Sequence, residues 1–150
     1  MKSPFALSAV FVSTMMLCSC HRLAAPENQW FHAMAALLVC HYLADFCLTT
    51  RGMIEAKTLD GSIIHILFHA AIHAVLVAAV LYVFDVPAGG CLLGSLIEFF
   101  SHFFIDTGKI FLTRYKPILK DMKRKSYWML FGFDQLLHLL VILTLTLLYL

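Results

Sequence analysis

Ionisable side chains recur at four-residue intervals in the most apolar parts of this chain. The clearest case contains Glu98, His102 and Asp106 within an apolar run from Ala88 to Leu112. On a helix this spacing stacks the three side chains on one face. An ionisable group at membrane depth is costly and normally faces a partner or a cavity rather than lipid. The stretch therefore predicts a polar site that other helices must complete.

Three further apolar segments carry sets with the same interval. These sets are His41 with Asp45, then His65 with His69 and His73, and finally Asp134 with His138. Each set lines one face of its helix. One residue of each set lies at a similar depth, roughly 9–12 Å from the end of its helix on one common side of the bundle, at a rise of about 1.5 Å per residue. These residues are His41, His69, Asp106 and Asp134. The spacing predicts one polar layer in the core of an antiparallel bundle.

The composition is that of a membrane protein. The chain has 150 residues, of which 61% are hydrophobic and 13% charged, whereas soluble domains have about 45–50% and about 25%. We expect an all-α polytopic fold, with a four-helix transmembrane domain at 30–150 and an N-terminal apolar segment and loop at 1–29. The expected helices cover 30–49, 62–84, 88–113 and 127–150. The five cysteines include no C-x-x-C pair and are interpreted as helix-packing thiols.

The N-terminal apolar segment allows several interpretations. It is either signal-like or a fifth span, because it is short for a crossing helix. Leu17-Cys18-Ser19-Cys20 approximates a lipoprotein cleavage box, which would lipidate Cys20. Met34 is an alternative start. These alternatives stay open.

Basic residues are concentrated on one side of the predicted topology. Six of them fall between the third and fourth helices: Arg114, Lys116, Lys120, Lys123, Arg124 and Lys125. Arg51 and Lys57 lie between the first two helices. Positive loops stay in the cytoplasm, so we expect 50–61 and 114–126 to be cytoplasmic. The bilayer is the expected partner, with anionic lipid contacting 114–125; no nucleic acid is expected, and the oligomeric state stays open.

The chemistry best suited to the polar layer is metal binding. Imidazole and carboxylate groups suit Zn, Mn or Fe, and a cation offsets buried carboxylate charge. The alternative is that the layer is structural, but interhelical hydrogen bonds in membranes average only about 0.6 kcal/mol. We expect a divalent metal and favour two ions, because one tetrahedral ion needs only four groups. The expected ligands are His41, Asp45, His69, His102, Asp106, Asp134 and His138.

Other polar residues near the layer receive secondary roles. Glu98 and His65 are candidate catalytic bases, and a structural pairing is the alternative for Glu98. Lys109 is a candidate for steadying an oxyanion, and extension to the membrane interface is its alternative. His73 is assigned a hydrogen-bonding role.

The combined motifs resemble a known family. They are His41-Tyr-Leu-Ala-Asp45-Phe, the downstream Lys57, the helix of His69, His102-Phe-Phe-Ile-Asp106-Thr-Gly-Lys109, and Asp134-Gln135-Leu-Leu-His138. Over about Met34 to Leu150 the chain resembles domain-of-unknown-function family 3307. The resemblance implies a small bacterial or phage protein of the inner membrane. Thr49 departs from the glutamine frequent in the family, and the N-terminal extension is outside its pattern.

Two classes of function remain open at this stage. The chain is also distantly similar to predicted membrane-bound metal-dependent hydrolases, which implies a metal-activated water attacking an ester, phosphoester or amide at the cytoplasmic interface. The alternative is a non-enzymatic protein: a metal carrier, a sensor, or a scaffold with a structural polar layer. A carrier is disfavoured because the sequence lacks the paired interrupted helices of transporters.

Overall fold

The structure, a computed structural model, describes residues 28–58 and 62–149 and contains no β-strand within them. The elements are α2 (Gln29–Tyr42), the π-helical turn η2 (Leu43–Cys47), α3 (Arg51–Thr58), α4 (Ile63–Val83), α5 (Ala88–Tyr115), the 3₁₀ turn η3 (Pro117–Lys120) and α6 (Lys125–Tyr149). The all-α prediction is confirmed. The N-terminal segment predicted at 1–29 falls almost entirely outside the described residues.

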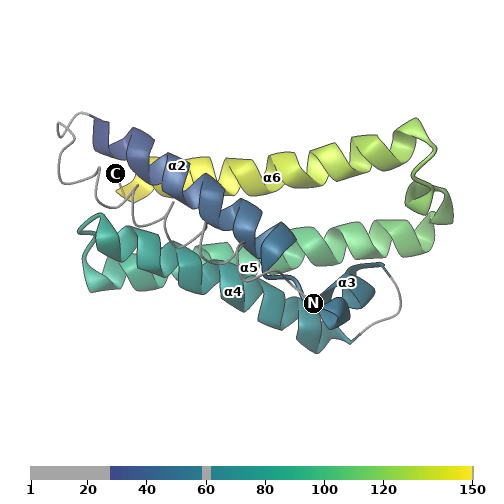
Figure 1. Cartoon of the computed structure of the whole chain (residues 1–150), viewed down its shortest axis with the longest axis horizontal. Helices are drawn as coiled ribbons and strands as arrows, with labels where there is room; N and C mark the ends of the chain where they lie inside the picture. The colour runs from purple at the N-terminus through teal and green to yellow at the C-terminus, as the bar shows by residue number, and fades with distance from the viewer. Residues whose placement is uncertain (1–27, 59–61, 150) are drawn as a thin grey trace.

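Four helices are long and apolar enough to cross a membrane. They are Gln29–Cys47, Ile63–Val83, Ala88–Tyr115 and Lys125–Tyr149, close to the predicted spans. Figure 1 shows them running along one long axis in alternating directions. Their outward faces carry large apolar side chains such as Phe104, Phe111 and Leu147, which are 66%, 68% and 75% exposed. Such a surface is suited to lipid rather than to water.

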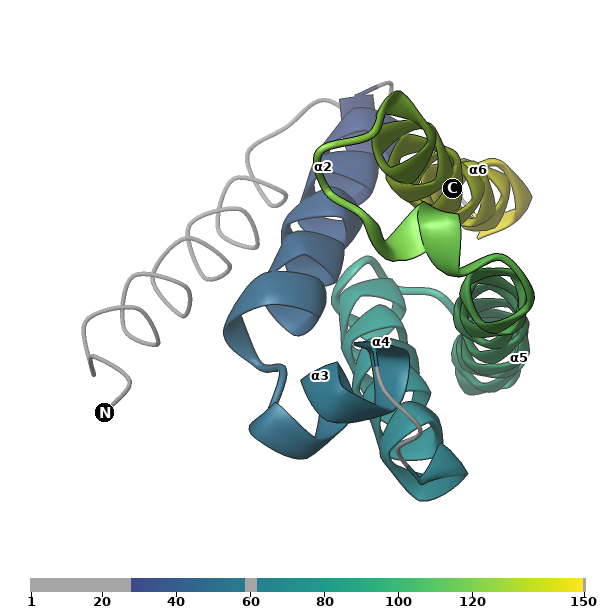
Figure 2. The same ribbon diagram turned by 90° about the vertical axis from the view of Figure 1, so that its right-hand side faces the viewer.

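The two polar connections lie at the same end of the bundle. In Figure 1, α3 and the η3 segment are at the right, and the tight turn between α4 and α5 is at the left. Figure 2 looks onto the end with α3 and η3. The sequence prediction that 50–61 and 114–126 share one side is consistent with this arrangement.

The connection between the first two spans is helical rather than the predicted polar loop. Thr50 caps α3, because its Oγ1 accepts a hydrogen bond from the Met53 amide at 3.3 Å. Met53 and Ala56 are buried, so the apolar face of α3 packs inward. This packing turns Lys57 toward the bundle.

The first span widens where it carries Asp45. The amide of Leu48 donates to the carbonyl of Leu43 at 2.8 Å, which closes the wider ring of the π-helical turn η2. Such turns are rare in proteins, and those that occur are often found at functional sites.

Apolar packing closes the bundle at the end with the α4–α5 turn. The larger cluster there includes Leu37, Val77, Leu81, Ile142 and Leu145. A Cβ at Gly94 would collide with Leu81, so glycine permits the close approach of α4 and α5. A smaller cluster of Ala56, Ile66 and Ile110 lies toward α3. The polar layer lies between the two clusters.

Candidate metal centre

Ionisable residues from all four long helices meet in one buried layer. Each of these side chains is at most 7% exposed. The layer comprises His41, Asp45, His69, His73, Glu98, His102, Asp106, Asp134 and His138. It includes every metal ligand predicted from the sequence.

The four-residue spacing stacks the pairs within each helix as expected. On α5, His102 Nδ1 is 3.3 Å from Glu98 Oε1, and His102 Nε2 is 3.6 Å from Asp106 Oδ2. The Nε2 atom of His41 is 3.5 Å from Asp45 Oδ2. Helical periodicity thus accounts for which groups face inward.

Packing between helices brings the imidazoles into contact around His102. The His102 ring centroid is 3.6 Å from that of His73, 4.1 Å from that of His138 and 5.0 Å from that of His69. The His41 ring is 5.0 Å from that of His73. His102 is fully buried and forms the centre of the layer.

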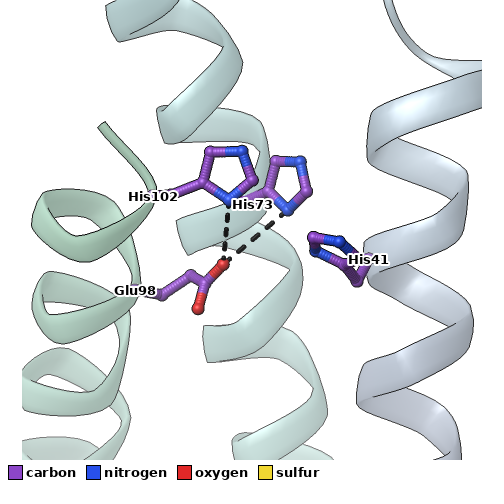
Figure 3. Close-up of side chains that lie close together, drawn as sticks. All are labelled: His41, His73, Glu98 and His102. Carbon is purple, nitrogen blue, oxygen red and sulfur yellow. Dashed lines mark hydrogen bonds and ion pairs between the residues drawn. The ribbon is translucent and has the colours of Figure 1, made fainter. Parts of the chain in front are cut away.

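Glu98 orients two of these rings. Figure 3 shows its carboxylate facing the imidazoles of His73 and His102, with the second nitrogen of each ring on the far side. The Oε1 atom of Glu98 is 3.3 Å from His102 Nδ1 and 3.7 Å from His73 Nδ1. A carboxylate against one imidazole nitrogen is the usual device for directing the other nitrogen at a metal.

The second nitrogens of the His73 and His102 rings point away from Glu98 and face other carboxylates. His73 Nε2 is 3.5 Å from Asp45 Oδ1, and His102 Nε2 is 3.6 Å from Asp106 Oδ2. Within the described residues neither nitrogen has a hydrogen-bond partner. Buried polar atoms are normally satisfied, so two such nitrogens facing carboxylates form a group that could hold a cation.

Lys57 brings a positive charge to the same place. Its Nζ is 2.8 Å from Asp106 Oδ2, 2.8 Å from His69 Nε2 and 3.4 Å from Asp45 Oδ1. Burial alone would lower the pKa of this ammonium, but Asp106 and Asp45 outweigh burial and hold the pKa above its usual range. Lys57 is therefore charged at neutral pH.

Three sets of donor atoms are close enough to hold an ion, with the atoms of each set within 4.8 Å of one another. The sets are His41, His73, Glu98 and His102; Asp45, His69, His73 and His102; and His102, Asp106 and His138. His102 belongs to all three. Six of the seven predicted ligands belong to these sets, and Glu98 joins one of them.

Asp134 lies beside the donor sets with Lys109. The Nζ of Lys109 is 2.7 Å from Asp134 Oδ2 and 5.1 Å from the centre of the Phe131 ring. Gln135 Nε2 donates to Asp45 Oδ2 at 3.3 Å. These contacts fix the polar groups at the edge of the layer.

His65, predicted as a candidate base, is outside the donor sets. A Cβ at Gly52 would collide with its imidazole, so His65 packs α4 against α3. Sequence reasoning undervalued His73, although it is four residues from His69. Sequence reasoning also missed that Lys57 contacts the layer. The segment around Lys57 is too short for its apolar pattern to show which way this side chain points.

The layer is open toward the end with α3 and η3. A cavity of about 560 Å³ there reaches Asp45, Lys57, Lys109 and Asp134. Glu98 does not line this cavity and lies on the side closed by the larger apolar cluster. The layer can therefore be reached from outside the bundle on this side.

A four-helix bundle with an apolar exterior and buried histidines and carboxylates defines a polytopic membrane protein. The chain belongs to the family described as protein of unknown function DUF3307, which matches residues 33–150. No curated protein matches the chain. No solved structure matches it either.

Proposed function

We propose that the polar layer binds a divalent metal ion between η2, α4 and α5. The observation that carries the proposal is a pair of buried nitrogens, His73 Nε2 and His102 Nε2, that form no hydrogen bond within the described residues. Glu98 directs them toward Asp45 and Asp106. Asp45, His69, His73 and His102 supply three nitrogens and one carboxylate, a donor set suited to Zn, Mn or Fe. Asp106 and His138 would lie adjacent to the ion.

Charge balance supports one ion. Four carboxylates (Asp45, Glu98, Asp106 and Asp134) are accompanied by the ammonium groups of Lys57 and Lys109. With all four carboxylates ionised and the imidazoles neutral, this leaves two negative charges, which one divalent ion would neutralise. The second ion expected from the sequence is untested and is not part of this proposal, because the three donor sets share His102.

We further propose that the ion serves hydrolysis at the membrane interface. A divalent ion lowers the pKa of bound water and so supplies a nucleophile near neutral pH. Lys109, at the cavity and 28% exposed, could steady an oxyanion. Glu98 lies off the cavity, which supports an orienting role rather than contact with substrate. The reaction class rests on the accessible cavity and on analogy with membrane-bound hydrolases.

The membrane location of the proposed centre follows from charge. The basic residues cluster at the end with α3 and η3, which we propose to be cytoplasmic in a bacterial inner membrane. Their ammonium and guanidinium groups would also contact anionic lipid at that surface.

The alternative is a structural layer without metal. Its support is Lys57, which already lies 2.8 Å from Asp106 and could serve as the permanent cation of the layer. A buried charge pair is stable when each partner has its counter-charge. The two proposals differ in whether the purified protein contains metal.

Metal analysis and activity test the proposal together. Protein purified in neutral detergent without chelator should contain a divalent metal, and His102→Ala should contain little. The wild-type protein should hydrolyse chromogenic ester or phosphoester probes, and activity should disappear with chelator and return with metal. Wild-type protein that holds metal but hydrolyses none of these probes would support the carrier or sensor alternative.

A further inference from the structure

The cavity at the α3 and η3 end has two chemically different parts. Its floor is polar, formed by Asp45, Asp134 and Gln135. Its walls are mostly apolar and come from η2, α3, the η3 segment and α6. They include Phe46, Ile54, Leu119, Met122, Tyr127 and Phe131. A polar floor beneath apolar walls fits a molecule with a polar head and an apolar chain, and about 560 Å³ is an ordinary volume for a ligand site.

The charge of the cavity selects an anion. Lys57, Lys109 and Lys120 line it, against the carboxylates of Asp45 and Asp134. Lys120 is exposed and has no ion-pair partner in the part of the chain that the structure describes. The lining thus carries one excess positive charge, and a divalent ion in the layer below would add two more.

The position of the cavity favours a lipid over a free anion. α5 has 28 residues and α6 has 25, which exceeds the roughly 20 residues needed to cross a bilayer. Their ends therefore reach the interface, where the cavity opens between them and α3. Lipid headgroups occupy this depth.

We propose that the cavity binds an amphiphile with a phosphate headgroup. The headgroup lies against Lys109 and Lys120, and the chain lies along Phe46, Ile54 and Phe131. This inference rests on the proposed function in one respect: the headgroup then lies beside the metal, and a phosphate ester of a lipid becomes the substrate class.

Binding can be tested with three probes on the full chain in neutral maltoside detergent. The probes are dihexanoyl phosphatidic acid, dihexanoyl phosphatidylcholine and glycerol 3-phosphate, measured by titration calorimetry. We expect the first to bind at least about tenfold more tightly than either of the others, because only it combines an unshielded anionic head with apolar chains. Equal binding of glycerol 3-phosphate would overturn the lipid assignment. Equal binding of phosphatidylcholine would overturn the selection for anions.

Matched variants locate the binding site. Lys120→Gln should weaken phosphatidic acid binding by about threefold to fivefold, the worth of an exposed ion pair. Lys123→Gln, on the same connection but outside the cavity lining, should leave binding unchanged. Ile54→Asp should weaken binding by at least about tenfold through lost apolar contact and like-charge repulsion, and Ile118→Asp should not. Both isoleucines are about half exposed, at 53% and 50%, so both variants should fold. Equal effects within each pair would overturn the proposal.

The metal content of the same samples separates this inference from the proposed function. Metal-free wild-type protein that still selects phosphatidic acid through Lys120 would refute the metal centre and keep the cavity assignment. Metal-loaded protein that does not discriminate among the probes would refute the cavity assignment and keep the metal centre.

Discussion

Replacing Lys57 by methionine separates a metal centre from a structural layer. The substitution keeps the length of the side chain and removes the ammonium that lies 2.8 Å from Asp106 and 3.4 Å from Asp45. Removing one partner of a buried ion pair costs about 3–5 kcal/mol. Lys57 is 24% exposed, so we expect the lower end, about 3 kcal/mol, for metal-free protein.

A bound divalent ion should offset most of that loss of stability. It supplies the missing charge to the same carboxylates, which leaves only the lost contacts of the side chain, about 1 kcal/mol. The loss of stability is thus about 2 kcal/mol smaller in the metal-loaded protein than in the metal-free protein. By linkage, the variant must bind metal more tightly than the wild type by the same free energy, which is about thirtyfold. Lys57→Met should therefore be unstable with chelator, nearly normal with metal, and a stronger metal binder than the wild type.

The assay measures unfolding free energy and metal affinity on the same protein. Unfolding is followed by titrating SDS into neutral mixed micelles, with chelator or with Zn, Mn or Fe, and affinity by competition with a chromophoric chelator. Arg51→Gln is the control on the same helix, because the Arg51 side chain is 92% exposed and pairs with Glu55 at the surface rather than with the layer. A loss of stability in Lys57→Met that metal does not reverse, with metal affinity no higher than in the wild type, would refute the reasoning.

Three further predictions follow from the arrangement of the layer. His102→Ala should lower metal affinity by at least about a hundredfold, which at saturating metal removes about 2.7 kcal/mol of stabilisation, whereas His65→Ala should keep the metal; equal metal loss in both, measured by elemental analysis, would contradict this. Glu98→Gln should retain metal but bind it about tenfold to a hundredfold more weakly, since it loses the carboxylate that orients His73 and His102; if Glu98 is instead the catalytic base, affinity stays at the wild-type level and only turnover is lost. A reporter active only in the cytoplasm should work when fused at 121–123 and fail at the C-terminus, and the reverse pattern would invert the topology.

The predictable part of this molecule is the part governed by periodicity and by the bilayer. Four-residue spacing identified the inward faces of all four spans, and the cost of burying charge identified Glu98 and His102 as members of a site. Bilayer thickness fixed the helix lengths within a few residues. These constraints act locally on the chain, so a single sequence contains them.

The rest depends on tertiary packing. The helix α3 is short, and its direction is set by Met53 and Ala56 packing on the bundle rather than by its own pattern. The position of Lys57 follows from that packing. The π-helical turn at Asp45 and the contact of Glu98 with both His73 and His102 depend on how the helices approach one another. Four-residue spacing does reveal that His73 shares a face with His69, but not that it touches His102.

The central claim is that the layer holds a metal ion, and elemental analysis of the purified wild-type chain tests it most directly. Protein prepared in neutral detergent without chelator should contain about one divalent ion per chain. Chelator should remove the ion and lower stability, and added Zn, Mn or Fe should restore both. A metal-free preparation that is as stable with chelator as without it, and unchanged by all three metals, would contradict the claim and leave Lys57 as the permanent cation of a structural layer.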